Sequence, residues 1–253
     1  MEKFRLTVKL YITTMKKFLT YLGMLLASVP CSHAATIIQN FEGVTTPSIP
    51  NGWTTVGSPV TAANGNPGNS IVGQSGSTNY IVNSGAGFDA NFDISGSFDF
   101  YIVESGNYSN GAFFFGNVQS GLGSSAGDHL RIDLRERTFG ARANILDANG
   151  TTLFDGSANN NFRIDSNAWY SAVFSWTAAT NTFNIDWTGP NNVVNVNMTV
   201  SGYSLNSSEV FFGFGTVDDE ARFDNINITG VPEPSVAMFS SLACLAFFIR
   251  RRS

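Results

Sequence analysis

The amino-acid sequence predicts an all-β domain, built as an antiparallel two-sheet sandwich. Three observations between residues 35 and 230 lead to this prediction: apolar and polar residues alternate with period two, clusters of Gly, Asn and Ser separate the alternating runs, and no stretch shows helical periodicity. Alternation of this kind gives a strand one buried and one solvated face. About twelve short strands with frequent turns and no helices are typical of a sandwich.

Four runs show the alternation most clearly, and each predicts a strand with one face in the core. The apolar residues of these faces are Leu130, Ile132 and Leu134; Tyr170, Ala172, Phe174 and Trp176; Phe183, Ile185 and Trp187; and Val194, Val196, Met198 and Val200. Three further runs, 97–104, 112–118 and 210–214, are more continuously apolar and predict central strands. Residues 64–69 and 147–150 predict turns, and the Gly-, Asn- and Ser-rich segment 59–77 predicts a long surface loop.

Residues 1–34 predict a secretory signal peptide with a signal helix. Met15, Lys16 and Lys17 form a basic start, and the apolar run 18–29 follows it. Small residues at its end place the cleavage after Ala34 or Ala35. Two interpretations of residues 1–14 stay open: they extend the basic region, or translation starts at Met15.

Residues 231–253 have three parts in a fixed order. Val231-Pro232-Glu233-Pro234 comes first, an uncharged run over 235–249 predicts a transmembrane helix, and Arg250, Arg251 and Arg252 close the chain. At about 1.5 Å per residue the apolar run reaches ~22 Å, short of a hydrocarbon core of about 30 Å. The arginines are expected to stay cytoplasmic.

This three-part tail resembles the PEP-CTERM sorting signal of bacterial envelope proteins. The resemblance implies that an exosortase-type membrane protease recognises Glu233 with its flanking prolines and that the hydrophobic tail is then removed. The protein is therefore expected at the cell envelope, the cell surface or the extracellular matrix, after transient anchoring in the inner membrane. The alternative is an ordinary C-terminal membrane anchor.

Composition excludes several classes of function for the domain at 35–230. All four lysines and both cysteines lie outside it, and six arginines against 17 acidic residues give the domain a formal charge of −11. Such a charge disfavours nucleic acid and anionic lipid as partners. One histidine, His129, remains, which excludes most zinc-hydrolase and Ser-His-Asp schemes. Without a disulfide the domain must depend on its core, with a metal as an alternative support.

Several motifs of the domain resemble the concanavalin A-like, laminin-G-type jelly roll. They are Asn40-Phe41-Glu42-Gly43, Gly52-Trp53, the run 169–176 and the closing run 222–228. Phe41-Glu42 together with Phe223-Asp224-Asn225 also resembles carbohydrate-binding jelly rolls. That resemblance implies a structural calcium shared by Glu42 and Asp224, and the alternative is that both are exposed carboxylates at turns or strand edges.

The residues 131–136 decide between catalysis and binding. Retaining glucanases of the concanavalin A-like fold carry Glu-x-Asp-x-x-Glu on one strand, so that two carboxylates share a face. Here Arg131 replaces the leading Glu, and Glu136 falls on the opposite strand face from Asp133, so we expect no catalysis. Arg131, Asp133 and Arg135 share a polar face that could bind sugar hydroxyls or uronic acids, and the alternative is a cross-strand ladder of salt bridges.

Four tryptophans, Trp53, Trp169, Trp176 and Trp187, could stack on sugar rings. Trp176 and Trp187 lie on predicted buried faces, whereas Trp53 lies in a Pro- and Gly-rich loop and is expected to be an exposed platform. The sequence thus predicts an exported, non-catalytic surface or matrix protein associated with exopolysaccharide. The alternative is a calcium-supported, lectin-like carbohydrate-binding module, and a divergent glycoside hydrolase is the least favoured class.

Overall fold

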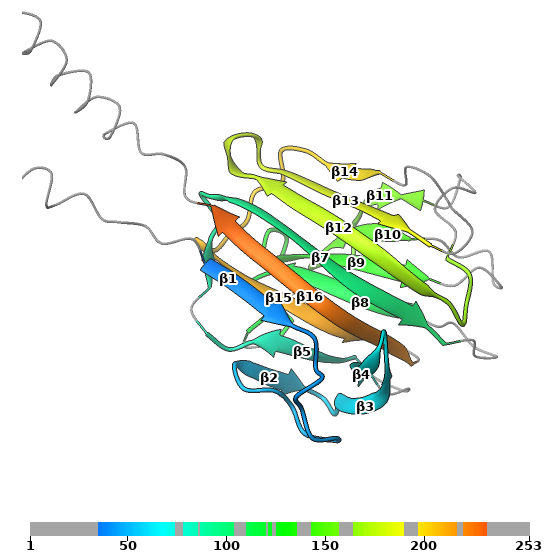
Figure 1. Ribbon diagram of the computed structural model, residues 1–253. Helices are drawn as coiled ribbons and strands as arrows, with labels where there is room; N and C mark the ends of the chain where they lie inside the picture. Colours follow the sequence, from blue (N-terminus) through cyan, green and yellow to red (C-terminus); the bar gives the residue numbers. More distant parts are fainter. Residues whose placement is uncertain are drawn as a thin grey trace, which may run out of the picture. The chain divides into compact units, whose positions relative to one another are not determined.

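The computed structural model describes residues 35–73, 78–85, 87–103, 110–119, 121–122, 125–135, 143–156, 164–189, 197–216 and 220–231 (Figure 1). The predicted signal peptide up to Ala34 and the sorting tail from Pro232 onward lie outside these residues, as do Glu136, Val194 and Val196. Within the described ranges, no helix reaches the length and hydropathy needed to cross a membrane.

The first of two antiparallel sheets has the strand order β14-β13-β12-β7-β16-β4-β3, and β1 pairs with β16 beside this path. Its strands are β1 (Ala35–Gln39), β3 (Val60–Gly65), β4 (Gly68–Gly73), β7 (Asp93–Ile102), β12 (Trp169–Thr177), β13 (Thr182–Thr188), β14 (Met198–Val200) and β16 (Ala221–Val231). A short 3-10 helix, η3 (Ala178–Thr180), joins β12 to β13. Because Ala35 pairs with Gly230, the start of β1 lies beside the end of β16.

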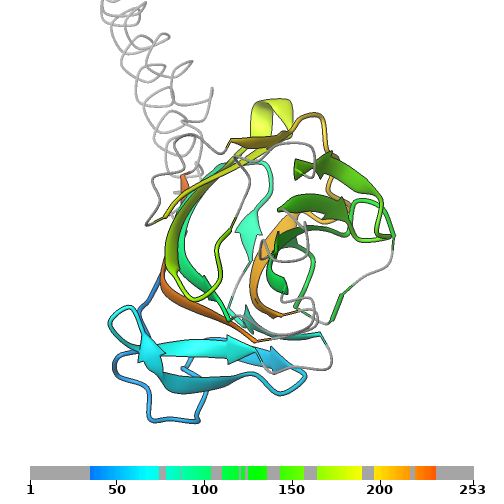
Figure 2. The same ribbon diagram turned by 90° about the vertical axis from the view of Figure 1, so that its right-hand side faces the viewer.

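The second sheet has the order β11-β10-β9-β8-β15-β5-β2, and β6 pairs with β15 beside this path. Its strands are β2 (Trp53–Val56), β5 (Asn79–Asn83), β6 (Phe88–Asp89), β8 (Asn110–Gly116), β9 (His129–Arg135), β10 (Asn144–Asp147), β11 (Thr152–Asp155) and β15 (Glu209–Thr216). Figure 2 shows the two sheets as two layers that face each other. The predicted all-β antiparallel sandwich is confirmed.

Phenylalanine rings fill the space between the two sheets. Phe98 of β7 lies 4.9 Å from Phe113 of β8 and 5.2 Å from Phe214 of β15, measured between ring centroids. Phe174 of β12 lies 4.9 Å from Phe113. Each such pair is worth about 0.5–1.5 kcal/mol beyond the area that it buries. These contacts cross from one sheet to the other and join the layers.

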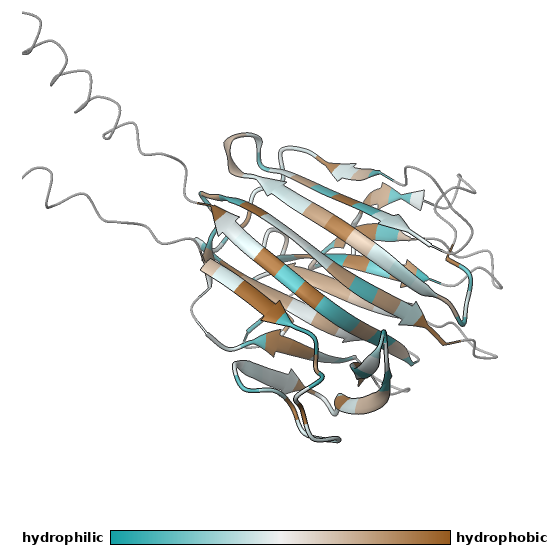
Figure 3. Ribbon diagram, in the orientation of Figure 1, coloured by the Kyte–Doolittle hydropathy of each residue, from teal (hydrophilic) through white to brown (hydrophobic). Residues whose placement is uncertain are grey.

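The strand predictions are confirmed wherever the structure describes them. The apolar faces of β9, β12 and β13, and Met198 and Val200 of β14, are buried, while β16 alternates between hydrophobic and hydrophilic residues along its length (Figure 3). The three continuously apolar runs form β7, β8 and β15, each of which has a neighbouring strand on both sides.

The prediction of a surface loop over 59–77 is wrong in its described part. This segment forms the hairpin β3–β4, and Ile71 is fully buried in the core because β4 pairs with Phe223 of β16. The polar residues that suggested a loop are concentrated in the turn between the two strands. The apolar pair Ile71-Val72 anchors the strand in the core, and it is too brief to stand out in the sequence.

We expect Phe98→Ala to lower the free energy of unfolding by about 3–5 kcal/mol, because the substitution opens a cavity where both sheets meet. Chemical denaturation followed by tryptophan fluorescence measures the change. Ile38→Ala is the control, since Ile38 is 75 % exposed and its loss should cost less than about 0.5 kcal/mol. Equal stabilities of the two variants would contradict the assigned core.

Candidate functional site

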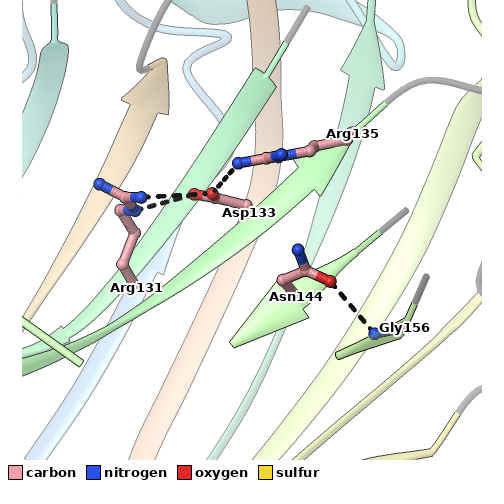
Figure 4. Close-up of polar contacts among 5 residues, drawn as sticks. All are labelled: Arg131, Asp133, Arg135, Asn144 and Gly156. Carbon is pink, nitrogen blue, oxygen red and sulfur yellow. Dashed lines mark hydrogen bonds and ion pairs between the residues drawn. The ribbon is translucent and has the colours of Figure 1, made fainter. Parts of the chain in front are cut away.

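Arg131, Asp133 and Arg135 form a charge ladder on the outer face of β9 (Figure 4). Leu130, Ile132 and Leu134 alternate with them and point into the core, so strand alternation places the ladder on the opposite side of the sheet. Arg131 Nε lies 2.9 Å from Asp133 Oδ1, and Arg135 Nη2 lies 2.9 Å from Asp133 Oδ2. One carboxylate therefore holds two guanidinium groups, and the pairs run along the strand and not across strands.

The carboxylate of this ladder is buried, contrary to the expectation of a solvated face. The side chain of Asp133 is 1 % exposed, whereas those of Arg131 and Arg135 are 26 % and 30 % exposed. Burial of a charge is costly unless it is paired, and here two guanidinium groups compensate it. The arginines thus remain accessible while their partner does not.

The neighbouring strands supply no second carboxylate at this position among the described residues. Asp133 pairs with Ala112 on β8 and with Asn144 on β10, and Asn144 accepts a hydrogen bond from the Gly156 amide at 3.1 Å (Figure 4). Retaining glycosidases need two carboxyl groups about 5 Å apart. Among the described residues, the two strands paired with β9 therefore do not supply this second carboxyl group, and the next carboxylate of the row is Asp155 of β11.

Guanidinium donors remain for a ligand after the ion pairs are made. A guanidinium has five N–H groups, and Arg135 directs its Nη2 at Asp133. Its Nε is buried and out of a ligand's reach, so the exposed part of the side chain, which is 30 % of it, presents the donors that remain. Such a planar group can bind carboxylate or hydroxyl oxygens.

An apolar cluster lies beside the ladder on the same outer face. Its buried members are Tyr80, Val82, Ala112, Phe114, Val118 and Phe211. The rings of Tyr80 and Phe114 lie 5.0 Å apart, and Gly213 stands between them in the sheet, where an added Cβ would come within 3.2 Å of both rings. The alternation of Phe and Gly in β15 is the sequence signal for this packing, and the sequence analysis did not use it.

His129 is the first residue of β9, two positions before Arg131, and it is almost fully buried. Burial lowers the pKa of His129 to about 4, and the positive charge of Arg131 adds to this effect. The imidazole is therefore neutral at pH 7. The sequence analysis missed this neighbour of the ladder because the strand pattern placed it on a solvated face.

Glu42 and Asp224 both accept hydrogen bonds from the turn of the β3–β4 hairpin. Asp224 accepts hydrogen bonds from the backbone amides of Asn66 and Asn225, both at 2.7 Å. Glu42 accepts one from the amide of Asn69 at 3.2 Å. The two carboxylates thus hold one hairpin turn from two sides, and the alternative of two exposed carboxylates is wrong for Asp224, which is fully buried.

Glu42, Asp224 and the turn of the β3–β4 hairpin form what we call the hairpin corner. Asp99 of β7 is a third carboxylate in this corner, and the sequence did not predict it. Asp99 Oδ1 accepts the hydroxyl of Ser171 at 2.6 Å, and Oδ2 accepts Nδ2 of Asn225 at 2.7 Å. Burial raises the pKa of Asp224 to about 6, the two backbone amides oppose the rise, and the charges of Glu42 and Asp99 add to it.

The described oxygens of this corner do not form a calcium shell. Calcium takes about six to eight oxygen ligands, whereas both oxygens of Asp224 and of Asp99 already accept hydrogen bonds. In the described ranges, no group of three metal-ligating side chains converges. Structural calcium stays a prediction, and the visible role of the corner is to fasten the hairpin to β16.

The prediction that Trp53 is an exposed platform is wrong. Trp53 is 8 % exposed and packs against Phe214 at 6.1 Å between ring centroids, because it opens β2 and faces the core. Part of it lines a cleft of about 350 Å³ that Gln39 of β1 and Phe88 of β6 also line. Trp176 and Trp187 are buried in the core, as predicted.

We expect Asp224 to make the fold more stable as the pH falls from 7 to 5. The folded state takes up a proton near pH 6 and the unfolded state only near 3.8, so protonation between these values favours folding by roughly 1–3 kcal/mol. Buried His129 destabilises the fold over the same pH range, because its pKa is lowered from 6.5 to about 4. The contribution of Asp224 is therefore the difference between wild type and Asp224→Asn, which should shift in favour of the wild type as the pH falls from 7 to 5, as measured by denaturant titration at several pH values. The same slope in the variant and the wild type would assign the effect to another group.

Comparison with known proteins identifies the fold alone. No protein-family model and no curated protein matches the chain. Among solved structures, lectin I from Ulex europaeus in complex with the methyl glycoside of α-L-fucose matches with a TM-score of 0.56 and 13 % identity, over 79 % of this chain and 99 % of that one. Winged bean acidic lectin complexed with methyl-α-D-galactose gives 0.54 and 12 %, over 78 % and 98 %.

Arcelin-5, a lectin-like defense protein from Phaseolus vulgaris, matches equally well, with a TM-score of 0.54 and 12 % identity over 79 % of this chain and 99 % of that one. Identities this low show no common function. The structural similarity does confirm the predicted architecture: the chain has the concanavalin A-like jelly-roll fold of the legume lectins.

Proposed function

We propose that the protein is a non-catalytic, lectin-like carbohydrate-binding module. The observation that carries the proposal is the charge ladder of β9, in which a buried carboxylate holds two partly exposed arginines on the outer face of a sheet. The similarity to lectin structures supports the proposal at the level of the fold. The site itself is argued from the ladder, because a fold does not determine a function.

Fixed guanidinium groups are suited to a sugar ligand that carries carboxylates or closely spaced hydroxyls. Asp133 restricts both arginines before a ligand arrives, which lowers the entropy that binding must overcome. The domain as a whole is acidic, with a formal charge of −11 between residues 35 and 230. Long-range electrostatics therefore oppose the approach of a uronic acid polymer, and short hydrogen bonds to the arginines must supply the affinity.

We expect Arg135→Lys to weaken binding of an acidic glycan such as polygalacturonate or alginate by about tenfold, because an ammonium keeps the charge and loses the planar fork. Calorimetric titration of the purified protein measures the affinity. Lysine can still pair with Asp133, so the melting temperature should change little. Truncation to alanine is unsuitable, since it removes one partner of a buried charge.

Arg222→Lys is the matched control, because Arg222 lies on the other sheet, is 22 % exposed and pairs with Glu220 at 2.7 Å. It should bind as the wild type does. No acidic glycan binding by the wild type, or equal binding by Arg135→Lys, would overturn the ladder as the site. A parallel titration with a chelator tests calcium support, which predicts loss of binding when calcium is removed.

We further propose that the protein is exported and sorted through its C-terminal tail, on the order of motif, apolar run and arginine cluster at 231–253. An exosortase-type protease would then cut near Glu233 and release the module into the envelope or matrix. Intact-mass measurement of envelope and secreted fractions should find a chain that ends near Pro234. Mature protein that keeps Cys244 and Arg250 in every fraction would exclude this route.

A further inference from the structure

A shallow hollow of about 230 Å³ lies on the outer face of the first sheet, over β12, β13 and the start of β14. Side chains from neighbouring strands line it, among them Val173, Ser175, Asn184, Asp186 and Asn197. Cross-strand pairing brings them together, since Val173 pairs with Asp186 and Ser175 pairs with Asn184. Neither the charge ladder nor the hairpin corner contributes to it.

The carboxylate of Asp186 is the unusual group of this hollow. Its Oδ1 is buried and has no hydrogen-bond partner among the described residues. Asp186 as a whole residue is only partly buried and lines the hollow, so hydroxyl donors of a ligand can approach the carboxylate from that side.

Two amides beside the carboxylate are held in place by one hydroxyl. Thr199 Oγ1 lies 2.6 Å from Oδ1 of Asn184 and 3.1 Å from Oδ1 of Asn197. The hydroxyl has one proton and donates it to one of these oxygens at a time, and the described residues show no acceptor for the NH₂ groups of the two amides. The hollow thus combines a fixed acceptor with fixed donors.

Val173 supplies the apolar part of the hollow. It is 55 % exposed on β12, at one side of the site, and pairs with Asp186 of β13. One exposed valine is ordinary on a protein surface. Beside a carboxylate and two amides, however, it provides a surface for the C–H face of a sugar ring, whose hydroxyls lie around its edge.

The charges of the hollow select among ligands. No Lys or Arg lines it among the described residues, so uronic acids and phosphates find no cation there. One carboxylate falls short of the oxygen ligands that calcium requires. The hollow is smaller than the roughly 300–1,000 Å³ pockets of drug-sized ligands, which fits a single ring.

We propose that this hollow binds a hexose unit of a neutral polysaccharide and is a second glycan site, distinct from the ladder of β9. Hydroxyls of the sugar donate to Asp186 and accept from Asn184 and Asn197. Ser97 and Asn227 continue the row of Asp186 and Val173 across β7 and β16, so the remainder of a chain can lie across the strands. The inference extends the proposed carbohydrate binding to another face and another class of sugar.

The test is titration of the purified protein with a neutral glycan panel, such as laminarin, dextran and galactomannan, beside the acidic glycans. We expect Asp186→Ala to lower affinity for the neutral ligand at least about tenfold and to leave acidic glycan binding unchanged. Val173→Ser, at an exposed position that tolerates substitution, should lower it about threefold to tenfold without altering the melting temperature.

Thr188→Ala is the matched control, since Thr188 lies on β13, faces the same side and is absent from the hollow. It should bind neutral glycans like the wild type, as should Arg135→Lys. Unchanged neutral binding in both Asp186→Ala and Val173→Ser, or no neutral binding by the wild type, overturns the second site. The acidic glycan titration on the same samples decides the ladder separately, so failure of one site is distinguishable from failure of the other.

Discussion

Aromatic packing between the sheets is the interaction on which the other features depend. Phe98, Phe113, Phe174 and Phe214 join the two layers through ring contacts of about 5 Å. The domain has no cysteine between residues 35 and 230, so no disulfide can take over this role. Loss of the inter-sheet contacts would separate the two sheets. Both candidate sites would lose their support, since each lies on the outer face of one sheet.

The core also determines which residues reach the surface. Ile132 and Leu134 fix β9 in the core, and strand alternation then directs Asp133 to the outer face. A shift of register by one residue would exchange the two sets and bury both arginines. The chemistry of the ladder is therefore set by the apolar residues between its members, even though they touch no ligand.

Period two in the sequence predicts most of this architecture, because each strand of the sandwich has a clear apolar face. The alternation over 169–176 and 182–188 predicts β12 and β13 with their buried sides. The hairpin β3–β4 escaped prediction since the apolar part of β4 is only Ile71 and Val72 and its burial depends on β16, far along the chain. Trp53 escaped for a similar reason: its loop composition suggests exposure, while Phe214 of a distant strand covers it.

Site residues were harder to predict than strands. Their burial and hydrogen bonds depend on partners that are distant in the sequence, and the sequence does not show which residues these are. The sequence assigns Asp133 to an outer face but does not show that two arginines cover its carboxylate. A resemblance in the sequence links Glu42 with Asp224. It does not show that the backbone amide of Asn66, 158 residues away, donates a hydrogen bond to the carboxylate of Asp224. The hollow at Asp186 has no sequence signal, since Asn, Ser and Asp on a strand also describe an ordinary solvated face.

The inner face of each sheet packs against the inner face of the other, so the two outer faces point in opposite directions. Sheets in a sandwich pack about 10 Å apart, which places the ladder and the hollow on opposite surfaces of one thin and rigid body. A module with a glycan on both surfaces is a crosslink: it holds two polymer chains in a fixed relation without forming a dimer. The density of such modules, and not their affinity alone, would then set the mesh of the polysaccharide around them.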